Sequence, residues 1–221
     1  MERVPQIPVH TENEFPKNLK SLNGQRGAIT MTKFNPNMKS IVTSSNDSTV
    51  MIWHLGKNRR PIKHAKHTGP VNSIDITPNG LIVASASSDK TIRLWSEESR
   101  ILKSHTGPVR DVNFSCDGQI LLSCSDDKTL KLWNIGEKKL LNTISAHKNW
   151  IRTCAFSPDS RTLVSGSDDT SIKFWDAATS TCLAKIKDHA GMINRVRYHP
   201  DGSCLASCSS DKKVKIFDAR S

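Results

Sequence analysis

Serine, histidine, aspartate and tryptophan recur along this chain in a fixed order, and the first three are the residue types that hydrolases use for nucleophilic catalysis. In the stretch "SCSDDKTLKLWNI" (residues 123–135), Ser123 lies four residues before Asp127, Trp133 lies six residues after it, and His105 lies upstream. A single copy has two interpretations, an acidic pair in an active site or a polar turn that leads into a strand. The number of copies decides between them.

The whole set recurs about every 40 residues. The aromatic position holds Trp53, Trp95, Trp133, Trp175 and Phe217, at spacings of 42, 38, 42 and 42. The aspartates six residues earlier are Asp47, Asp89, Asp127, Asp169 and Asp211. The hydroxyl residues are Thr43, Ser85, Ser123, Ser165 and Ser207, and the upstream position holds Gln25, His67, His105, His147 and His189. This period indicates an array of supersecondary units. Since a hydrolase needs one set aimed at one substrate, the repetition argues against catalysis.

Each unit carries the pattern of four β-strands and no helix pattern. After the upstream position, apolar residues follow a three-then-two step, as in Val109, Val112 and Phe114, which is strand alternation interrupted by a bulge. A turn such as "CDG" or "PDG" follows, then a small and apolar run such as "ILLSCS", the Asp turn, the Trp strand and a last, weaker segment. The sequence therefore predicts an all-β fold, a β-propeller of five blades with about twenty strands in five antiparallel sheets.

The ordered His, Ser, Asp and Trp resemble the WD repeats over residues about 22–218. In that family the four residues are described as a hydrogen-bonded tetrad inside each blade. The resemblance therefore implies three complete tetrads: His67, Ser85, Asp89 and Trp95; His105, Ser123, Asp127 and Trp133; His147, Ser165, Asp169 and Trp175. The first unit has Gln25 in place of His and the last has Phe217 in place of Trp, so we expect the end units to be the least tightly specified.

The predicted domain division is a flexible lead over residues 1–18 and a WD-repeat propeller over 19–221. Its units lie near 22–60, 61–100, 101–142, 143–184 and 185–221. Leu19 to Leu22 occupies the place of an outer strand before the first unit, so a five-blade ring has one formal way to close. We favour an open or incomplete ring, because the resemblance implies a wedge angle suited to seven blades. An open arc exposes two sheet edges, an aggregation hazard unless another chain covers them.

A narrower resemblance carries a functional expectation. The stretches "STVMIWHL", "HKNWIRTCAFSPD", "SDDTSIKFWD" and "YHPDGSCLAS" are similar to the centriolar WD-repeat proteins of the proteome-of-centriole protein 1 family. That family has seven repeats and a C-terminal extension with a coiled coil, whereas this chain has five repeats and no such tail. The resemblance implies a non-enzymatic scaffold at the centriole, centrosome or basal body, which supports microtubule triplets and cilium formation. Its partners would be acidic cytoskeletal or centriolar proteins such as the tubulin surface.

The net charge also favours acidic partners. Lysine and arginine number 32 against 21 aspartates and glutamates, a net charge of +11, and residues 1–110 hold 16 of the basic and 8 of the acidic residues. The stretch "GKNRRPIKHAKH" (56–67) carries five basic residues and no acid. Nucleic acid, an anionic membrane face and an acidic protein surface all suit such a balance. The alternative for this stretch is a solvated strand edge, where lysines discourage edge pairing.

Several function classes are disfavoured by the sequence. No apolar run approaches the length of a membrane span and the opening "MERVPQIPVHTENEFPKN" is polar, so we expect a soluble, cytoplasmic protein without membrane contact. Cysteines 116, 124, 154, 182, 204 and 208 form no CxxC, which argues against a disulfide framework. Cys124 and Cys208 share one register and suggest small buried packing. The histidines lie on different units, which argues against a metal site. No cofactor and no small-molecule substrate are expected.

One residue breaks the repeat and marks a candidate partner-binding surface. Three positions after the upstream residue the units carry Ala28, Pro70, Pro108, Trp150 and Met192, and two positions further Thr30, Asn72, Arg110, Arg152 and Asn194. The residues before each repeat aspartate are Asn46, Ser88, Asp126, Asp168 and Ser210. In WD propellers these positions share the top face. A tryptophan beside arginine is typical of an interaction hot spot, and the alternative is that Trp150 packs over the adjacent loop. We predict a partner site of Trp150, Arg152, Arg110, Asp126, Asp168, Met192 and Asn194.

Another class of function stays open at this point. A nucleic-acid- or chromatin-associated WD-repeat adaptor is compatible with the charge of +11. Against it, no strand face interleaves aromatic and basic residues, as a single-strand binder needs.

Overall fold

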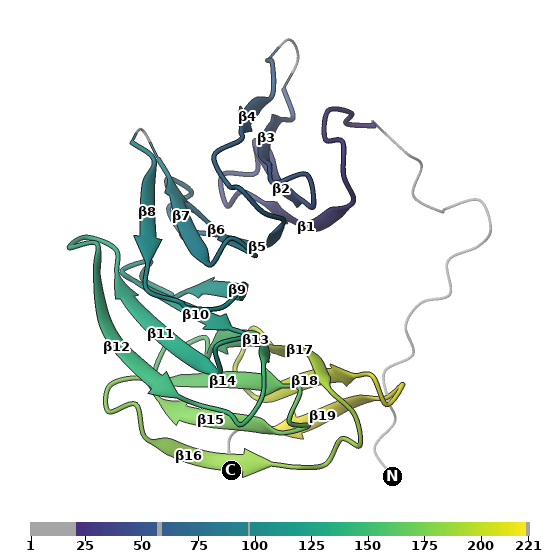
Figure 1. Ribbon diagram of the computed structural model, residues 1–221, viewed down its shortest axis with the longest axis vertical. Coiled ribbons are helices and arrows are strands. Elements are labelled where there is room, and N and C mark those ends of the chain that lie inside the picture. Colours follow the sequence, from purple (N-terminus) through teal and green to yellow (C-terminus); the bar gives the residue numbers. More distant parts are fainter. Residues whose placement is uncertain (1–20, 57–58, 97, 220–221) are drawn as a thin grey trace.

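The structure, a computed structural model, describes residues 21–56, 59–96 and 98–219. Over these residues the chain forms nineteen β-strands and no helix. The strands make five antiparallel sheets that follow one another around an arc (Figure 1). The all-β prediction with five blades is confirmed. The predicted lead over 1–18 and Lys57 lie outside the described residues.

The sheets are numbered as blades in chain order. Blade 1 contains β1 (Ile29–Phe34), β2 (Ser40–Ser45), β3 (Val50–His54) and β4 (Ile62–His64). Blade 2 contains β5 (Val71–Ile76), β6 (Val83–Ser87), β7 (Thr91–Trp95) and β8 (Arg100–Lys103). Blade 3 contains β9 (Val109–Phe114), β10 (Ile120–Ser125), β11 (Thr129–Asn134) and β12 (Lys139–Ser145). Blade 4 contains β13 (Ile151–Phe156), β14 (Thr162–Ser167), β15 (Ile172–Asp176) and β16 (Cys182–Ile186). Blade 5 contains β17 (Ile193–Tyr198), β18 (Cys204–Ser209) and β19 (Val214–Asp218).

Strand order within each blade follows the chain. The first strand of every blade contacts the first strand of the next blade and lies on the inner side of the arc, and the fourth strand lies outside (Figure 1). The described part of blade 5 has three strands where the sequence predicted four, because the fourth strand of the other blades comes from the segment after the Trp strand and the described residues end at Ala219. The sheets do not follow the predicted unit limits. The strand β4 pairs with β3 of blade 1, although the sequence division placed the residues of β4 in the second unit.

The predicted bulges and tight turns are both present. The pairing of the first two strands shifts register between residues 29 and 31, 71 and 73, 151 and 153, and 193 and 195, and in blade 3 beside Ser125. In the turns that follow, Gly80, Gly118 and Gly202 have φ angles of 73°, 71° and 77°, a region that glycine enters without steric cost. The N–H of Gly118 donates to the carbonyl of Ser115 at 2.9 Å. These turns fix the register of the two innermost strands.

The hydrophobic core lies between the blades. Each of four buried clusters combines one face of a blade with the facing side of the next blade. Between blades 3 and 4, Leu122, Leu130 and Leu132 pack against Ile151 and Phe156. A sheet with two apolar faces can bury both of them only between two neighbours. The blades therefore stabilise one another in sequence around the arc.

The two ends of the arc expose the faces that the internal interfaces bury. Val214 and Ile216 of blade 5 are 72% and 73% exposed, whereas Leu130 and Leu132 at the same register in blade 3 are 0% and 4% exposed. At the other end Phe34 of blade 1 is 60% exposed. No described blade covers either of these faces, so the predicted open arc is confirmed (Figure 1).

Cys208 is more exposed than the sequence predicted, because it lies on the uncovered face of blade 5. Cys124 is fully buried between blades 3 and 4, as small buried packing requires. Cys208 has the same register in blade 5 but is only partly buried. In the described part of the chain no further blade covers it.

A matched pair of truncations tests where the core lies. Leu132→Ala should lower the free energy of unfolding by about 2–5 kcal/mol, because it opens a cavity between blades 3 and 4. Ile216→Ala removes side-chain atoms at the same register and should cost about 0.5 kcal/mol or less, because Ile216 is exposed. Urea unfolding followed by tryptophan fluorescence measures both. Equal losses in the two variants would contradict a core that lies between blades.

Candidate protein-interaction face

Three blades contain the same four-residue hydrogen-bond network. In blade 2, His67 Nδ1 lies 2.7 Å from Asp89 Oδ2, His67 Nε2 lies 2.8 Å from Ser85 Oγ, and Trp95 Nε1 donates to Ser85 Oγ at 2.8 Å. The network repeats with His105, Ser123, Asp127 and Trp133 in blade 3 and with His147, Ser165, Asp169 and Trp175 in blade 4. The histidine comes from the loop before the first strand, the serine from the second strand and the tryptophan from the third. Each network therefore joins three segments of one blade.

The electrostatics of the network favour a neutral histidine. Burial lowers the pKa of His67, although its hydrogen bond to Asp89 opposes this, and the pKa values of His105 and His147 are lowered in the same way. Burial opposes ionisation of Asp89, but hydrogen bonds from Thr91 and His67 outweigh it, so the pKa of this carboxyl falls below its usual value. A neutral imidazole donates from Nδ1 to the aspartate and accepts at Nε2 from the serine. Every member is satisfied, which a buried polar network requires.

The same geometry explains why these sets do not resemble a hydrolase site. Ser85, Ser123 and Ser165 are all 0% exposed. Each serine oxygen accepts the indole N–H of its own blade. A nucleophile must reach a substrate carbonyl, whereas these oxygens face the blade interior.

The two end blades contain variants of the network. In blade 1, Trp53 Nε1 donates to Thr43 Oγ1 at 2.8 Å, and Thr43 Oγ1 donates to Gln25 Oε1 at 2.7 Å. Gln25 turns its Nε2 to Thr49 rather than to Asp47. In blade 5 His189 still contacts Asp211 and Ser207, both at 2.7 Å. Phe217 lacks an indole N–H, so Ser207 receives no donor from the aromatic position.

Trp150 stands at the junction of blades 3 and 4 with its side chain 44% exposed. Its carbonyl accepts the N–H of Asp168 at 2.9 Å and the hydroxyl of Ser167 at 2.7 Å, which holds the backbone in place. The indole lies between two guanidinium groups, with Arg110 Cζ 6.0 Å and Arg152 Cζ 5.7 Å from the ring centroid. These are cation–π contacts, which add to the apolar area that the ring offers.

Both arginines are paired within their own blades. Arg110 Nε donates to Asp126 Oδ1 at 2.8 Å, and its Nη2 donates to Oδ2. Arg152 donates from Nε and Nη2 to the two oxygens of Asp168 at 2.7 and 2.8 Å, and this bond raises the pKa of Arg152. Each pair uses two of the five N–H donors of its guanidinium. The resemblance to WD propellers placed these residues on one face, but it did not indicate that the carboxylates satisfy the arginines.

The remaining predicted partner residues lie on the neighbouring blade. Met192 is 40% exposed and its carbonyl accepts the N–H of Ser210 at 3.0 Å, as Trp150 does for Asp168. Asn194 is exposed on β17. The residues at its register in blades 1 and 2 instead donate across a blade junction, from Thr30 to Val71 O at 2.6 Å and from Asn72 to Val109 O at 2.7 Å. We call the two Arg–Asp pairs and Trp150, together with Met192 and Asn194 at the equivalent positions of the next blade, the Trp150 patch.

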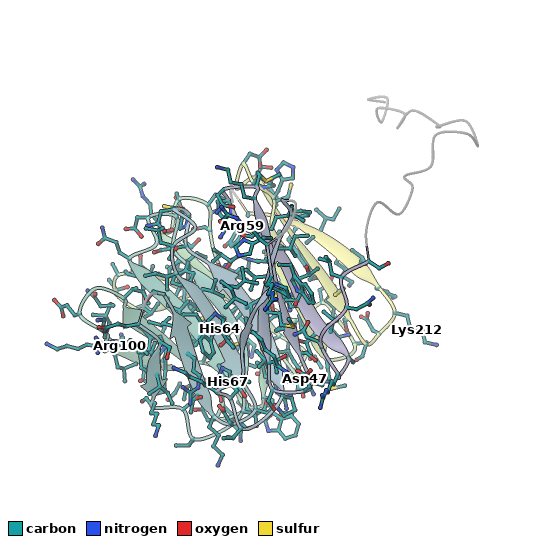
Figure 2. The ribbon with its side chains drawn as sticks, turned by 90° about the horizontal axis from the view of Figure 1, so that it is seen from above. Asp47, Arg59, His64, His67, Arg100 and Lys212 are labelled. Atoms are coloured by element: carbon teal, nitrogen blue, oxygen red, sulfur yellow. The ribbon has the colours of Figure 1, made fainter. Side chains whose placement is uncertain are left out.

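Arg59 and Arg60 of the basic stretch lie away from the Trp150 patch. The Asp47 turn precedes β3, whereas Arg59 and Arg60 come after it, so they lie near the opposite end of that strand. Figure 2 shows Asp47 and His67 toward one face and Arg59 toward the other. The Asp47 turn corresponds to the Asp169 turn beside Trp150. Arg59 and Arg60 therefore do not extend the patch.

A buried ion cluster on the inner side of the arc was not predicted from the sequence. Asp111 on β9 is 0% exposed and lies 3.3 Å from Arg197 Nη2 and 3.8 Å from Arg195 Nη2, both on β17. It also accepts the hydroxyl of Ser73 at 2.6 Å. Burial opposes ionisation of Asp111, but the two arginines outweigh it and lower its pKa. The one available signal was an aspartate at a strand position where the other units carry Met31, Ser73, Thr153 and Arg195.

The comparison with known families agrees with this architecture. The family "WD domain, G-beta repeat" matches residues 16–54, 60–96, 97–134, 138–176 and 180–218. The chain therefore belongs to the WD-repeat family, whose members bind other proteins.

Individual relatives match over shorter stretches. Eukaryotic translation initiation factor 3 subunit I of Neurospora crassa is 33% identical over 84 residues, 38% of this chain and 24% of the relative. Pre-mRNA-splicing factor cwf17 of Schizosaccharomyces pombe is 33% identical over 85 residues, 38% and 25% of the two chains. Small ribosomal subunit protein RACK1 of Neurospora crassa is 35% identical over 79 residues, 34% and 25% of the two chains. The matched segment spans about a quarter of the length of these relatives.

Two further observations concern the described residues alone. They contain no cluster of three or more His, Cys, Asp or Glu side chains arranged to hold a metal ion. None of them belongs to a helix with the length and apolarity of a membrane span.

His147→Ala should lower the free energy of unfolding by roughly 1–3 kcal/mol, because Ser165 and Asp169 lose a buried partner. Gln25→Ala should cost much less, because Gln25 is partly exposed and makes no hydrogen bond to the repeat aspartate of its blade. Thermal and urea unfolding of both variants provide the measurement. If both changes prove equally mild, the network does not stabilise this chain.

Stability should fall on acidification from pH 7.5 to pH 5.5. The folded state lowers the pKa of His67, His105 and His147 below the ordinary 6.5, so the unfolded chain binds more protons as the pH drops. The stabilisation is fully present above about pH 6.5 and is lost below it. A second loss of stability should begin below about pH 4, because the folded state lowers the pKa of Asp169 to about 2. Burial opposes ionisation of this carboxyl, but the hydrogen bond from Ser171 and the attraction of His147 outweigh it.

Urea unfolding at each pH measures this effect, and His147→Gln is the matched control. Glutamine is the residue that blade 1 uses at this position, so the variant keeps a polar side chain but removes one titrating group. Its stability should depend less steeply on pH than that of the wild type. A free energy of unfolding that rises between pH 7.5 and pH 5.5 would contradict the neutral histidines.

Proposed function

We propose that this WD-repeat chain is a protein-interaction scaffold that binds its partner through the Trp150 patch. The observation that carries the proposal is the exposed indole of Trp150, held between Arg110 and Arg152 on a backbone fixed by two hydrogen bonds. A large aromatic ring that is already ordered loses little conformational entropy on binding. Tryptophan and arginine are also the residues most enriched among interaction hot spots.

The internal Arg–Asp pairs define the chemistry of the partner. Because Asp126 and Asp168 neutralise the two arginines, the patch offers an apolar centre with a polar rim of low net charge. An apolar or aromatic side chain placed on Trp150 would supply most of the affinity. The unpaired N–H groups of the guanidinium edges would orient carbonyl or carboxylate oxygens around it.

The finer proposal concerns the assembly to which the scaffold belongs. The resemblance to centriolar WD-repeat proteins supports a role in centriole or basal body assembly and in cilium formation, with an acidic cytoskeletal partner such as the tubulin surface. The net charge of +11 supports an acidic partner as well. Since the patch itself is nearly neutral, long-range attraction would come from other residues, among them the exposed Arg59 and Arg60.

The second candidate is an adaptor in an RNA-containing assembly. The relatives named as an initiation factor subunit, a ribosomal protein and a splicing factor support it. In this case too the scaffold would contact proteins through the Trp150 patch, and the basic residues would contribute attraction to phosphate that weakens with salt.

Co-sedimentation with microtubules, and fluorescence titration with a single-stranded RNA at two salt concentrations, separate the two assemblies. If the partner is tubulin, Trp150→Ala should weaken microtubule binding by about 2 kcal/mol, roughly thirtyfold, because the anchor of the patch is lost. The melting temperature should stay nearly unchanged, because the indole is partly exposed.

Leu81→Ala is the matched control for this experiment. Leu81 is 71% exposed and lies in the turn between β5 and β6, at the opposite end of the inner strands from the loop of Trp150. It should change neither binding nor stability. If Trp150→Ala instead lowers the melting temperature and leaves binding unchanged, Trp150 is a packing residue and the patch loses its anchor.

A further inference from the structure

A cation on the third strand of blade 2 lacks the acceptor that its counterparts have. Lysines occupy the register of Arg93 in blades 3, 4 and 5, namely Lys131, Lys173 and Lys215. Lys131 Nζ donates to Thr143 Oγ1 at 2.9 Å across the strand pair, and the other two lysines donate to backbone carbonyl oxygens. Arg93 faces Ile101 in place of a threonine. Among the described residues, Arg93 Nε is the one buried side-chain nitrogen or oxygen without a hydrogen-bond partner.

Arg93 lines a hollow that has an excess of positive charge. The hollow has a volume of about 410 Å³, and its lining includes the cations of Lys90, Arg93 and Lys103. The lining includes one carboxylate, that of Asp89, which is held by His67 and other donors of its own blade. A buried donor without an acceptor is costly, and a guanidinium group binds carboxylates and phosphates strongly. The composition of the hollow therefore suits an oxyanion.

A second hollow adjoins the first along the outer strand of blade 2. It has a volume of about 440 Å³, shares Ile101 and Lys103 with the first hollow, and adds Leu102, Trp133 and Leu140 to the lining. Ile101 on β8 and Leu140 on β12 are each 39% exposed. Both strands lie on the outer side of the arc (Figure 1). An apolar surface thus continues from the cationic hollow toward blade 3.

The surroundings of the first hollow add positive charge and little free negative charge. Lys66 Nζ donates to Ser99 Oγ, which holds this ammonium group beside the start of β8. Glu98 forms an ion pair with Arg100, so its carboxylate is already matched. A concentration of cations with few competing carboxylates attracts anionic groups from a distance.

We propose that the two hollows, together called the Arg93 groove, bind an extended acidic segment of a partner protein. A carboxylate or phosphate group of the segment enters the hollow of Arg93 and Lys103, and a neighbouring apolar side chain lies on Ile101 and Leu140. The apolar half of the groove favours a peptide over a nucleic acid, whose phosphate backbone would leave it uncovered. The groove lies on blades 2 and 3 and shares no residue with the Trp150 patch, so the proposal does not rest on that patch.

Three peptide libraries with random neighbours around a fixed central residue are the probes. The central residue is phosphoserine in the first library, glutamate in the second and serine in the third. The full chain should select peptides from the first or the second library, with an apolar residue enriched beside the centre. The serine versions of the selected peptides should bind at least about tenfold more weakly in fluorescence anisotropy. Tighter binding of phosphoserine would identify a phosphorylated segment, and tighter binding of glutamate a segment rich in carboxylates.

Arg93→Met is the central variant, because blade 1 carries Met51 at the same register. It should weaken binding of the selected peptides at least about tenfold, because the guanidinium is lost. Its melting temperature should stay unchanged or rise, because the variant removes an unpaired buried donor. A residue that only stabilises the blade would show the opposite pattern, a lower melting temperature with unchanged binding.

A matched pair of lysines tests whether the position of the charge matters. Lys90 and Lys212 occupy the same place in the aspartate turns of blades 2 and 5, with φ angles of 70° and 67°. Lys90→Gln should weaken peptide binding severalfold, whereas Lys212→Gln removes the same charge and should have no effect. Figure 2 shows Arg100 of β8 and Lys212 at opposite sides of the molecule.

A second pair of variants tests the apolar half of the groove. Leu140→Ser should weaken binding of the selected peptides severalfold, because it removes apolar contact area. Leu183→Ser changes an exposed leucine on the outer strand of blade 4 and should have no effect. Trp150→Ala should bind the peptides normally, so failure of the Trp150 patch and failure of the Arg93 groove give different results.

Each other outcome overturns the proposal. If no peptide is selected, or if Arg93→Met leaves the affinity of the selected peptides unchanged, the groove does not bind an acidic segment. If the full chain selects no peptide but binds single-stranded oligouridylate, and if Arg93→Met weakens this binding while Leu140→Ser does not, the groove is a nucleic-acid site instead.

Discussion

Burial of two-faced sheets between neighbours is the constraint on which the rest of this molecule depends. No blade can cover its own apolar faces, so the position of each blade is set by the blades beside it. The Trp150 patch is a product of this arrangement. Arg110 belongs to blade 3 and Trp150 to the start of blade 4, and they meet because the Leu130 and Ile151 faces of those blades pack together.

The repeat aspartates connect the buried interior of each blade to its surface loops. Asp169 accepts the N–H groups of Ser171 and Lys148, as well as His147, and so joins the turn before β15 to the loop that leads to Trp150. Thr170 in this turn has a φ of 67°, a conformation that is uncommon for a non-glycine residue and is held here by the surrounding hydrogen bonds. A tetrad inside the blade thereby fixes the surface loop that carries Trp150.

Asp111 provides a different type of connection, between blades that are not neighbours. Its carboxylate on blade 3 meets Arg195 and Arg197 on blade 5 near the inner strands. A buried charge of this kind is costly unless several donors satisfy it, and it favours one arrangement over others rather than adding much net stability. Arg195 also reaches Met31 of blade 1, so this cluster lies where the two ends of the arc approach each other.

The sequence by itself determined the repeat, the strand order, the bulges, the tight turns and the membership of each tetrad. These features are local or strictly periodic, so each unit indicates them independently. Their recurrence in five units makes the prediction more specific. Only the tertiary structure decided that Asp126 and Asp168 neutralise the arginines beside Trp150, that Arg59 faces away from that patch, and that Asp111 pairs with Arg195 and Arg197. The physical reason is that these contacts depend on the direction of each side chain and on the angle between neighbouring blades. Both are set by packing between blades, and no single repeat encodes them.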